Sequence, residues 1–298
     1  MTEIINSNQD APESQPAKPV RTLEALLEFY AQGHRNFSGS DLRGVTVDMM
    51  DKEIKYIDLR GVILTGSNLA AALLTRYTSD FKVDLTGSYL DNCNLQAANF
   101  SHASLDRCNF SSSDLSGADL LNISCRGSDF IRAILQNIRS SENTDFTASD
   151  FTGANFSLST VSGNFTAANF TRTNFLAAQL IGKFIQANFS DADLRSVKFL
   201  ERSGGFRLSN FSGANLHSAN LAGDFSQSNF SNAILGNARF YCFHVQGSDF
   251  SDADLRIDFV DGGTFKYCYY NSNTKFSECL DPVASGMELI EDEIESED

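Results

Sequence analysis

The chain has 298 residues, of which 42% are hydrophobic and 20% charged, a composition typical of a folded protein rather than a disordered one. No apolar run reaches the roughly 20 residues that a membrane-spanning helix needs. The net charge of −15 argues against a basic surface that follows phosphate groups, so direct nucleic-acid binding is not expected. The sequence also holds 25 Phe, no Trp and only four Pro.

The first 20 residues are polar and contain three of the four prolines, so we expect a disordered extension over 1–20. Their pattern differs from that of a secretory signal, which favours a cytoplasmic protein over one of an organelle lumen. Behind this extension, Thr22 is placed to cap a helix within 21–34, which we expect to cover the first unit of the fold. Four apolar residues share one face of this helix: Leu23, Leu26, Leu27 and Tyr30.

Beyond residue 35, a large apolar residue recurs at every fifth position. Neither a helix, with 3.6 residues per turn, nor a strand, with a period of two, gives a period of five. A chain that turns sharply after each short extended piece does, and the residue two places before each large one is mostly small. Over 85–135 the series reads Leu85, Leu90, Leu95, Phe100, Leu105, Phe110, Leu115, Leu120, Cys125, Phe130 and Leu135.

The period shifts its register at a few places. Four-residue steps end at Phe165, Phe184 and Phe225, within the similar phrases SGNF, IGKF and AGDF, and a longer step ends at Phe206. These sites are about four pentads apart, and stacked coils of four pentads would bring them into one column. The sequence therefore predicts a solenoid in which one corner is shortened or extended on successive coils.

The repeated unit resembles the motif A(D/N)LXX of the pentapeptide-repeat family over roughly residues 35–279. Matching pentads begin at Ala118, Ala154, Ala192, Ala214 and Ala253. The resemblance implies an all-β fold, a right-handed quadrilateral parallel β-helix, here of about twelve coils behind the capping helix. The segment 26–37 also resembles the helix-then-repeat opening of many cyanobacterial members.

In such a fold the large residue of each pentad and the small residue two before it point inward. Phe rings can then stack in columns, Trp is too large for the interior, and Pro is excluded because backbone N–H groups must pair with the next coil. The core residues that we expect are Leu95, Phe100, Leu115, Leu120, Phe156, Phe170, Phe189, Phe211 and Phe230.

At the C-terminal end, 265–276 is an irregular, aromatic-rich last coil. More than half of the negative charge lies beyond it, because 281–298 carries net charge −8 whereas 21–280 carries −5. We expect 280–298 to be an acidic, disordered tail, with a short helix over 287–294 as the alternative. Such a tail would bind a basic partner surface, or keep the protein soluble and prevent end-to-end stacking.

The sequence carries few signs of catalytic chemistry. Asp and Asn alternate freely in the slot before the large residue, which indicates local turn bonding rather than acid–base work. Cys93, Cys108 and Cys125 fall on inward positions, and the four His are scattered. A disulfide between Cys268 and Cys279 is the alternative to free thiols in the last coil. We expect no enzymatic activity, no catalytic residues, no metal site and no cofactor.

Four interruptions of the repeat, at 48–56, 75–82, 139–144 and 200–205, are the candidate partner-binding loops; the alternative is that they are tolerated insertions. The residues that we single out in them are Asp51, Lys52, Lys55, Arg139, Glu142, Glu201 and Arg202.

A rigid rod with loops at one corner and no catalytic cluster favours a non-enzymatic scaffold or regulator that binds a protein, as a monomer or an end-to-end dimer. The family resemblance implies a regulatory role, since some cyanobacterial members act in heterocyst regulation, and a role in development or stress is one form of this. The alternative that it implies is a DNA mimic that binds a type II topoisomerase such as gyrase. The modest charge of the repeat region disfavours that alternative.

Overall fold

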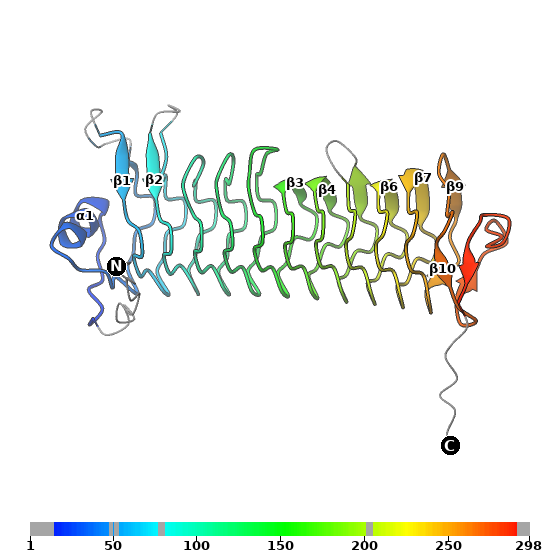
Figure 1. The fold of residues 1–298 in the computed structure, drawn as a ribbon. Coiled ribbons are helices and arrows are strands. Elements are labelled where there is room, and N and C mark those ends of the chain that lie inside the picture. Colours follow the sequence, from blue (N-terminus) through cyan, green and yellow to red (C-terminus); the bar gives the residue numbers. More distant parts are fainter. Residues whose placement is uncertain (1–14, 48–49, 51–53, 77–80, 201–204, 291–298) are drawn as a thin grey trace, which may run out of the picture.

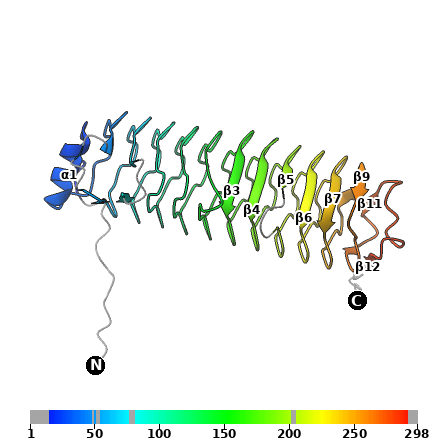
Figure 2. The same ribbon diagram turned by 90° about the horizontal axis from the view of Figure 1, so that it is seen from above.

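The computed structural model describes residues 15–47, 50, 54–76, 81–200 and 205–290. Over these residues the chain winds into a long parallel β-solenoid, with the helix at one end and strands β10 and β12 at the other (Figure 1, Figure 2). The elements are α1 (Leu23–Ala31), β1 (Tyr56–Asp58), β2 (Lys82–Asp84), β3 (Thr160–Asn164), β4 (Gln179–Lys183), β5 (Lys198–Leu200), β6 (Asn220–Asp224), β7 (Arg239–His244), β8 (Asp254–Leu255), β9 (Phe259–Asp261), β10 (Tyr269–Tyr270), β11 (Lys275–Phe276) and β12 (Glu288–Leu289). In the described part of the chain, no helix has the length and apolar character to cross a bilayer.

Parallel β-bridges between successive coils form four columns, so each coil has four sides. We name the sides faces A, B, C and D, and one coil shows them as Ser104, Asn109, Asp114 and Asp119, together with the residues bridged to these in other coils. Bridged residues are about 20 apart in the sequence, as between Asn109 and Asp129. Four pentads therefore make one coil, which confirms the quadrilateral fold that the family resemblance implied.

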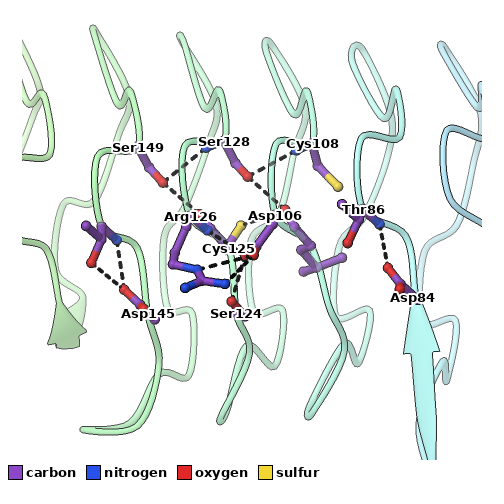
Figure 3. A network of polar contacts seen from close by, with 12 residues as sticks. Asp84, Thr86, Asp106, Cys108, Ser124, Cys125, Arg126, Ser128, Asp145 and Ser149 are labelled. Carbon is purple, nitrogen blue, oxygen red and sulfur yellow. Dashed lines mark hydrogen bonds and ion pairs between the residues drawn. The ribbon is translucent and has the colours of Figure 1, made fainter. Parts of the chain in front are cut away.

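The corners of the coil are made by Asp and Asn side chains. The carboxylate of Asp84 accepts a hydrogen bond from the Thr86 N–H at 2.9 Å (Figure 3). The carboxylate of Asp114 accepts one from the Ser116 N–H at the same distance. Asn94 makes the same bond to the Gln96 N–H at 3.2 Å. An acceptor oxygen suffices for this turn, whether charged or neutral. The prediction that this slot serves turn bonding is confirmed.

The core is a stack of apolar side chains at all four sides. Each of the nine core residues named from the sequence is at most 1% exposed. Inside face B the Phe rings form a column with centroids about 4.8–5.0 Å apart, close to the spacing between strands. This column runs through Phe110, Phe130, Phe151, Phe170, Phe189, Phe211, Phe230 and Phe250.

Buried serines line the inside of the corner between faces A and B. The Ser128 hydroxyl donates to the Leu105 carbonyl at 2.7 Å and accepts from the Cys108 N–H at 3.1 Å (Figure 3). Ser149 repeats this one coil later, donating to the Cys125 carbonyl at 2.7 Å. These hydroxyls join adjacent coils where the backbone turns and its own pairing is interrupted. Among the described residues, no buried side-chain nitrogen or oxygen lacks a partner.

The irregular steps of the repeat all lie between face D and face A, except for one step in the last coil. This step takes five residues from Asp119 to Ser124, six from Arg139 to Asp145 and four from Thr160 to Asn164. We name this corner, with the outward residues of β3–β7 and β9 that cross it, the variable edge; it is the upper border of the rod in Figure 1. The predicted shortening and extension of one corner is confirmed.

The N-terminal cap is larger than predicted. Helix α1 begins behind Thr22, whose side chain accepts from the Ala25 N–H at 3.2 Å, and its buried face covers the first coil as expected. The expectation of disorder over 1–20 is wrong for 15–20. There, the Lys18 N–H donates to the Asn36 carbonyl at 2.9 Å, and Val20 is buried. Residues 1–14 lie outside the described part.

The C-terminal end also differs from the expectation. The segment 280–290 is folded rather than disordered, because β12 pairs in parallel with β10 and the Met287 side chain is buried. Neither a helix nor disorder forms over 287–290, and 291–298 lie outside the described residues. Cys268 is a buried free thiol and Cys279 an exposed one, so the alternative of a disulfide between them is wrong.

Candidate partner-binding edge

The sequence-predicted loop residues that the structure describes lie on the variable edge. Lys55, Arg139 and Glu142 are exposed there, close to where the repeat is interrupted. The other four predicted residues, Asp51, Lys52, Glu201 and Arg202, lie outside the described residues. The assignment of these residues to a binding site stays a prediction.

Arg76 joins the first two interruptions. Its guanidinium donates to the carbonyl oxygens of Val47 at 3.1 and 3.3 Å, Met50 at 3.0 Å and Ile54 at 3.0 Å. The same group lies over the ring of Phe81, with 4.6 Å between the guanidinium carbon and the ring centroid. One side chain from the second interruption thus fixes the backbone on both sides of the first.

We expect Arg76→Ala to lower the free energy of unfolding by about 2 kcal/mol, because three carbonyl groups lose a charged donor. Arg76→Lys should recover little, since a single ammonium cannot match the fork of the guanidinium. Hydrogen–deuterium exchange of the Met50 and Lys82 amides, which both donate to carbonyls of this region, would report the loosening. Unchanged exchange and stability in Arg76→Ala would show that the two interruptions hold their shape without it.

The segment 139–144 is a compact turn rather than a projecting loop. The Thr144 hydroxyl donates to the Leu120 carbonyl at 3.1 Å and accepts from the Ser141 N–H at 3.0 Å, and the Ser141 hydroxyl donates to Asn122 at 3.0 Å. Arg139, Glu142 and Asn143 are the exposed residues of this segment. The turn adds one residue to the coil, and Asp145 beyond it bridges both Ser124 and Asn164.

The same six-residue step recurs at 271–274 in the last coil. There the Thr274 hydroxyl donates to the Phe250 carbonyl at 3.1 Å and accepts from the Asn271 N–H at 3.1 Å. Both turns share the sequence pattern Asn-Thr, a charged residue and Phe, ending at Phe146 and Phe276. That pattern could have identified the segment 139–144 as a tight turn from sequence alone.

Beyond this turn the variable edge becomes a six-stranded parallel sheet, in the order β3-β4-β5-β6-β7-β9. Its strands cross the corner in four residues where a Gly occupies the inner position. Gly163 and Gly182 have φ of +143° and +140°, and they pair with each other across β3 and β4. An added Cβ at Gly182 would lie only 2.1 Å from the Gly163 oxygen. The glycines therefore let adjacent strands cross the corner at normal sheet spacing.

An apolar row lies on the outer surface of this sheet, and sequence reasoning missed it. Ile181 pairs with Leu200 across β4 and β5, and Ala222 pairs with Tyr241 across β6 and β7. The row continues from β5 to β6 because Lys198 pairs with Asn220, two residues before Leu200 and Ala222. Leu200 is 38% exposed. These residues are about 20 apart in the sequence and meet only because the coils stack.

Two kinds of side chain flank the apolar row. Phe259 of β9 is 42% exposed and lies 5.2 Å from Tyr241, measured between ring centroids. Lys198 and Lys183 are exposed on the two sides of the row, and neither forms an ion pair with any described residue. The edge thus combines half-buried and exposed apolar side chains with two lysines that form no ion pair among the described residues.

Elsewhere on the rod, much of the acidic charge is neutralised by Arg. In the phrase Asp-Leu-Arg the two charged residues bind each other, as Asp193 does with Arg195 at 2.6 Å. The hydrogen bond from Arg195 holds the pKa of the Asp193 carboxyl below its usual range. Arg139 binds Asp119 of the preceding coil at 2.7 Å in the same manner. A DNA mimic needs uncompensated negative charge, so these pairs disfavour that alternative.

The thiols of the interior are unreactive at neutral pH. Burial raises the pKa of Cys93 and of Cys108 to about 12, and that of Cys268 to about 11. Within the described ranges, no three His, Cys, Asp or Glu side chains are close enough to hold a metal ion. The expectation of a non-enzymatic protein without cofactor stays a prediction.

Comparison with known proteins agrees with the repeat geometry. The family model for pentapeptide repeats matches residues 82–117, 108–139 and 209–241, in eight copies. Pentapeptide repeats are therefore present in these parts of the chain. No curated protein sequence matches it.

Solved structures of pentapeptide-repeat proteins are similar over much of the rod. HetL, involved in heterocyst differentiation regulation in the cyanobacterium Nostoc sp. strain PCC 7120, is 20% identical, with 90% of this chain and 92% of HetL covered and a TM-score of 0.29. Full-length QnrB1, a plasmid-mediated fluoroquinolone resistance protein, is 21% identical, with 85% and 92% covered and a TM-score of 0.28. Rfr23 from the cyanobacterium Cyanothece 51142 is 19% identical, with 42% and 99% covered and a TM-score of 0.21.

Proposed function

We propose that this protein is a non-enzymatic scaffold or regulator that binds a protein partner through its variable edge. The observation that carries the proposal is the apolar row Ile181, Leu200, Ala222 and Tyr241, which lies on the same corner as the interruptions of the repeat. A regular coil presents small polar groups that bond to one another. The variable edge departs from this pattern over the six-stranded sheet of β3–β7 and β9.

The chemistry of the edge indicates the kind of partner surface that fits it. An apolar strip of the partner would cover the row, and carboxylates beside that strip would meet Lys183 and Lys198. The rod is rigid because every coil is joined to its neighbours by backbone pairing. It would therefore bind with little loss of backbone freedom, and its contribution to affinity depends on a few well-placed side chains.

Affinity capture from native lysate tests this proposal. The tagged protein should capture one dominant protein, and the double variant Leu200→Glu/Tyr241→Glu should capture about tenfold less of it, because buried carboxylates would replace apolar contacts. The matched control is Ile134→Glu/Ile234→Glu, which changes two exposed side chains of face C, 38% and 44% exposed. Equal capture by the edge variant and the control would contradict the proposal.

A further inference from the structure

A second surface of the rod has a different chemistry from the variable edge. It is a cleft of about 400 Å³ at the corner between faces A and B, near the C-terminal end. Three of its lining residues come from corner positions of successive coils, namely Gln227, Gly247 and Tyr267. Its other side chains include Arg207, Asp224, Gln246 and Tyr269.

Four exposed polar side chains of this cleft are not used by the fold. The side-chain amides of Gln227 and Gln246 and the hydroxyls of Tyr267 and Tyr269 make no hydrogen bond to any residue that the structure describes. The two tyrosine side chains are 45% and 38% exposed. Along the rest of the solenoid, most Asn, Asp, Ser and Thr side chains bond within a turn or to the next coil.

A second cleft, near the N-terminal end, provides a comparison because its polar side chains form hydrogen bonds within the protein. A cavity of about 350 Å³ on face B near the N-terminal end contains one exposed Tyr, Tyr89. Several of its polar groups bond to one another or to the N-terminal cap. The Thr65 hydroxyl donates to Asp91 at 2.8 Å, and the Asn36 amide donates to the Gln15 carbonyl at 2.7 Å. A ligand there would have to displace these bonds, whereas the two amides and two phenol hydroxyls of the C-terminal cleft have no bond to a described residue to displace.

The floor of the C-terminal cleft is open because of Gly247. Its φ is +70°, but the equivalent positions one coil before and after hold Gln227 and Tyr267 with φ of +59° and +60°. The backbone at this corner thus accepts a side chain, and a Cβ at Gly247 would meet only the Gln227 Cγ, at 3.7 Å. The turn does not require glycine at position 247. The missing side chain of Gly247 leaves an open space between Gln227 and Tyr267.

The balanced charges of the cleft favour a neutral ligand over a charged one. Arg207 lies 3.6 Å from Asp224, so the charges that face the cleft compensate each other. Lys266 lies over the Tyr267 ring, 4.8 Å from its centroid, and does not line the cleft. Amides and phenol hydroxyls both donate and accept hydrogen bonds, as sugar hydroxyls require, and aromatic rings pack against the C–H faces of pyranose rings.

From this combination we propose that the cleft between Gln227 and Tyr269 is a binding site for a neutral carbohydrate. The rings of Tyr267 and Tyr269 pack against a sugar ring that enters over Gly247. The amides of Gln227 and Gln246 bond to its hydroxyl groups. This site shares only Asp224, at the end of β6, with the variable edge, so it does not depend on the proposed protein partner.

An array of neutral and anionic oligosaccharides tests the site, followed by titration calorimetry with the neutral hexasaccharide that binds best. We expect at least one neutral oligosaccharide to bind, and affinity to fall about tenfold or more in Tyr267→Ala and in Tyr269→Ala. Gly247→Gln should have the same effect by filling the cleft, and it removes no existing contact. Tyr89→Ala, in the N-terminal cleft, should bind like the unchanged protein.

Circular dichroism and thermal unfolding of each variant would show that the fold is kept. Failure of every neutral oligosaccharide to bind would overturn the proposal, as would binding of anionic oligosaccharides only. Binding that is unchanged in both Gly247→Gln and the tyrosine variants would also overturn it, since the sugar would then lie elsewhere. None of these three outcomes bears on protein binding at the variable edge.

Discussion

Gly182→Ala is expected to lower the free energy of unfolding by about 3 kcal/mol or more, as measured by chemical denaturation. The new Cβ would lie 2.1 Å from the Gly163 oxygen and would have to be accommodated at φ +140°. The Gly163 oxygen belongs to the backbone that pairs β3 with β4, so it cannot move away without opening the sheet. The damage should reach the apolar row, because Ile181 precedes Gly182.

Gly66→Ala is the matched control for this substitution. Gly66 lies at a turn with φ +66°, and no atom lies within 4 Å of its added Cβ. Ala71 occupies the next turn of the same coil with φ +55°, so alanine is compatible with this backbone. The control should therefore cost only about 1 kcal/mol. Equal losses from the two substitutions would refute the claim that close strand approach, rather than positive φ, makes Gly182 necessary.

Phe170→Ala should be comparably destabilising, by about 3–5 kcal/mol. The Phe170 side chain is fully buried, and its ring is stacked between those of Phe151 and Phe189, at centroid distances of 5.0 and 4.9 Å. Truncation would leave a cavity that the rigid coils above and below cannot fill. Thermal or denaturant unfolding followed by far-ultraviolet circular dichroism measures the change.

Phe170→Leu removes the aromatic ring but fills most of its volume, so it separates the loss of ring stacking from the loss of packing volume. Leu90 occupies the same face B position in an earlier coil and is fully buried there, so leucine fits this interior. We expect this variant to cost about 1 kcal/mol, well below the alanine variant. If both variants lost equal stability, the ring stack rather than the filling of the interior would be the source of the effect.

The five-residue period, together with the resemblance of its unit to pentapeptide repeats, was sufficient to predict the fold, because one residue per pentad has to face the core at each side of the coil. Asp119 and Leu120 illustrate this: their types alone indicate a turn acceptor and a core residue. The variable corner was also predictable, since Phe165 and Phe184 mark the shortened steps in the sequence itself. At every regular pentad, the residue that suits the turn and the residue that suits the core both favour the same fold.

The ends of the rod were predicted less well. Polar, Pro-containing residues before Val20 and acidic residues around Glu288 have the composition of disordered segments. They are nevertheless ordered because the first and last coils offer unpaired backbone groups, which composition does not reveal. The apolar row was missed for a related reason. Ile181, Leu200 and Tyr241 are isolated in the sequence and become neighbours only through stacking.

Site-specific photo-cross-linking in cells tests the central claim, that the variable edge is where a protein partner binds. A photoreactive amino acid would replace Leu200 or Tyr241 on the edge, and Ile134 or Ile234 on face C. We predict a cross-linked adduct of one defined mass from the two edge positions and none from face C. Adducts from face C without adducts from the edge would contradict the claim.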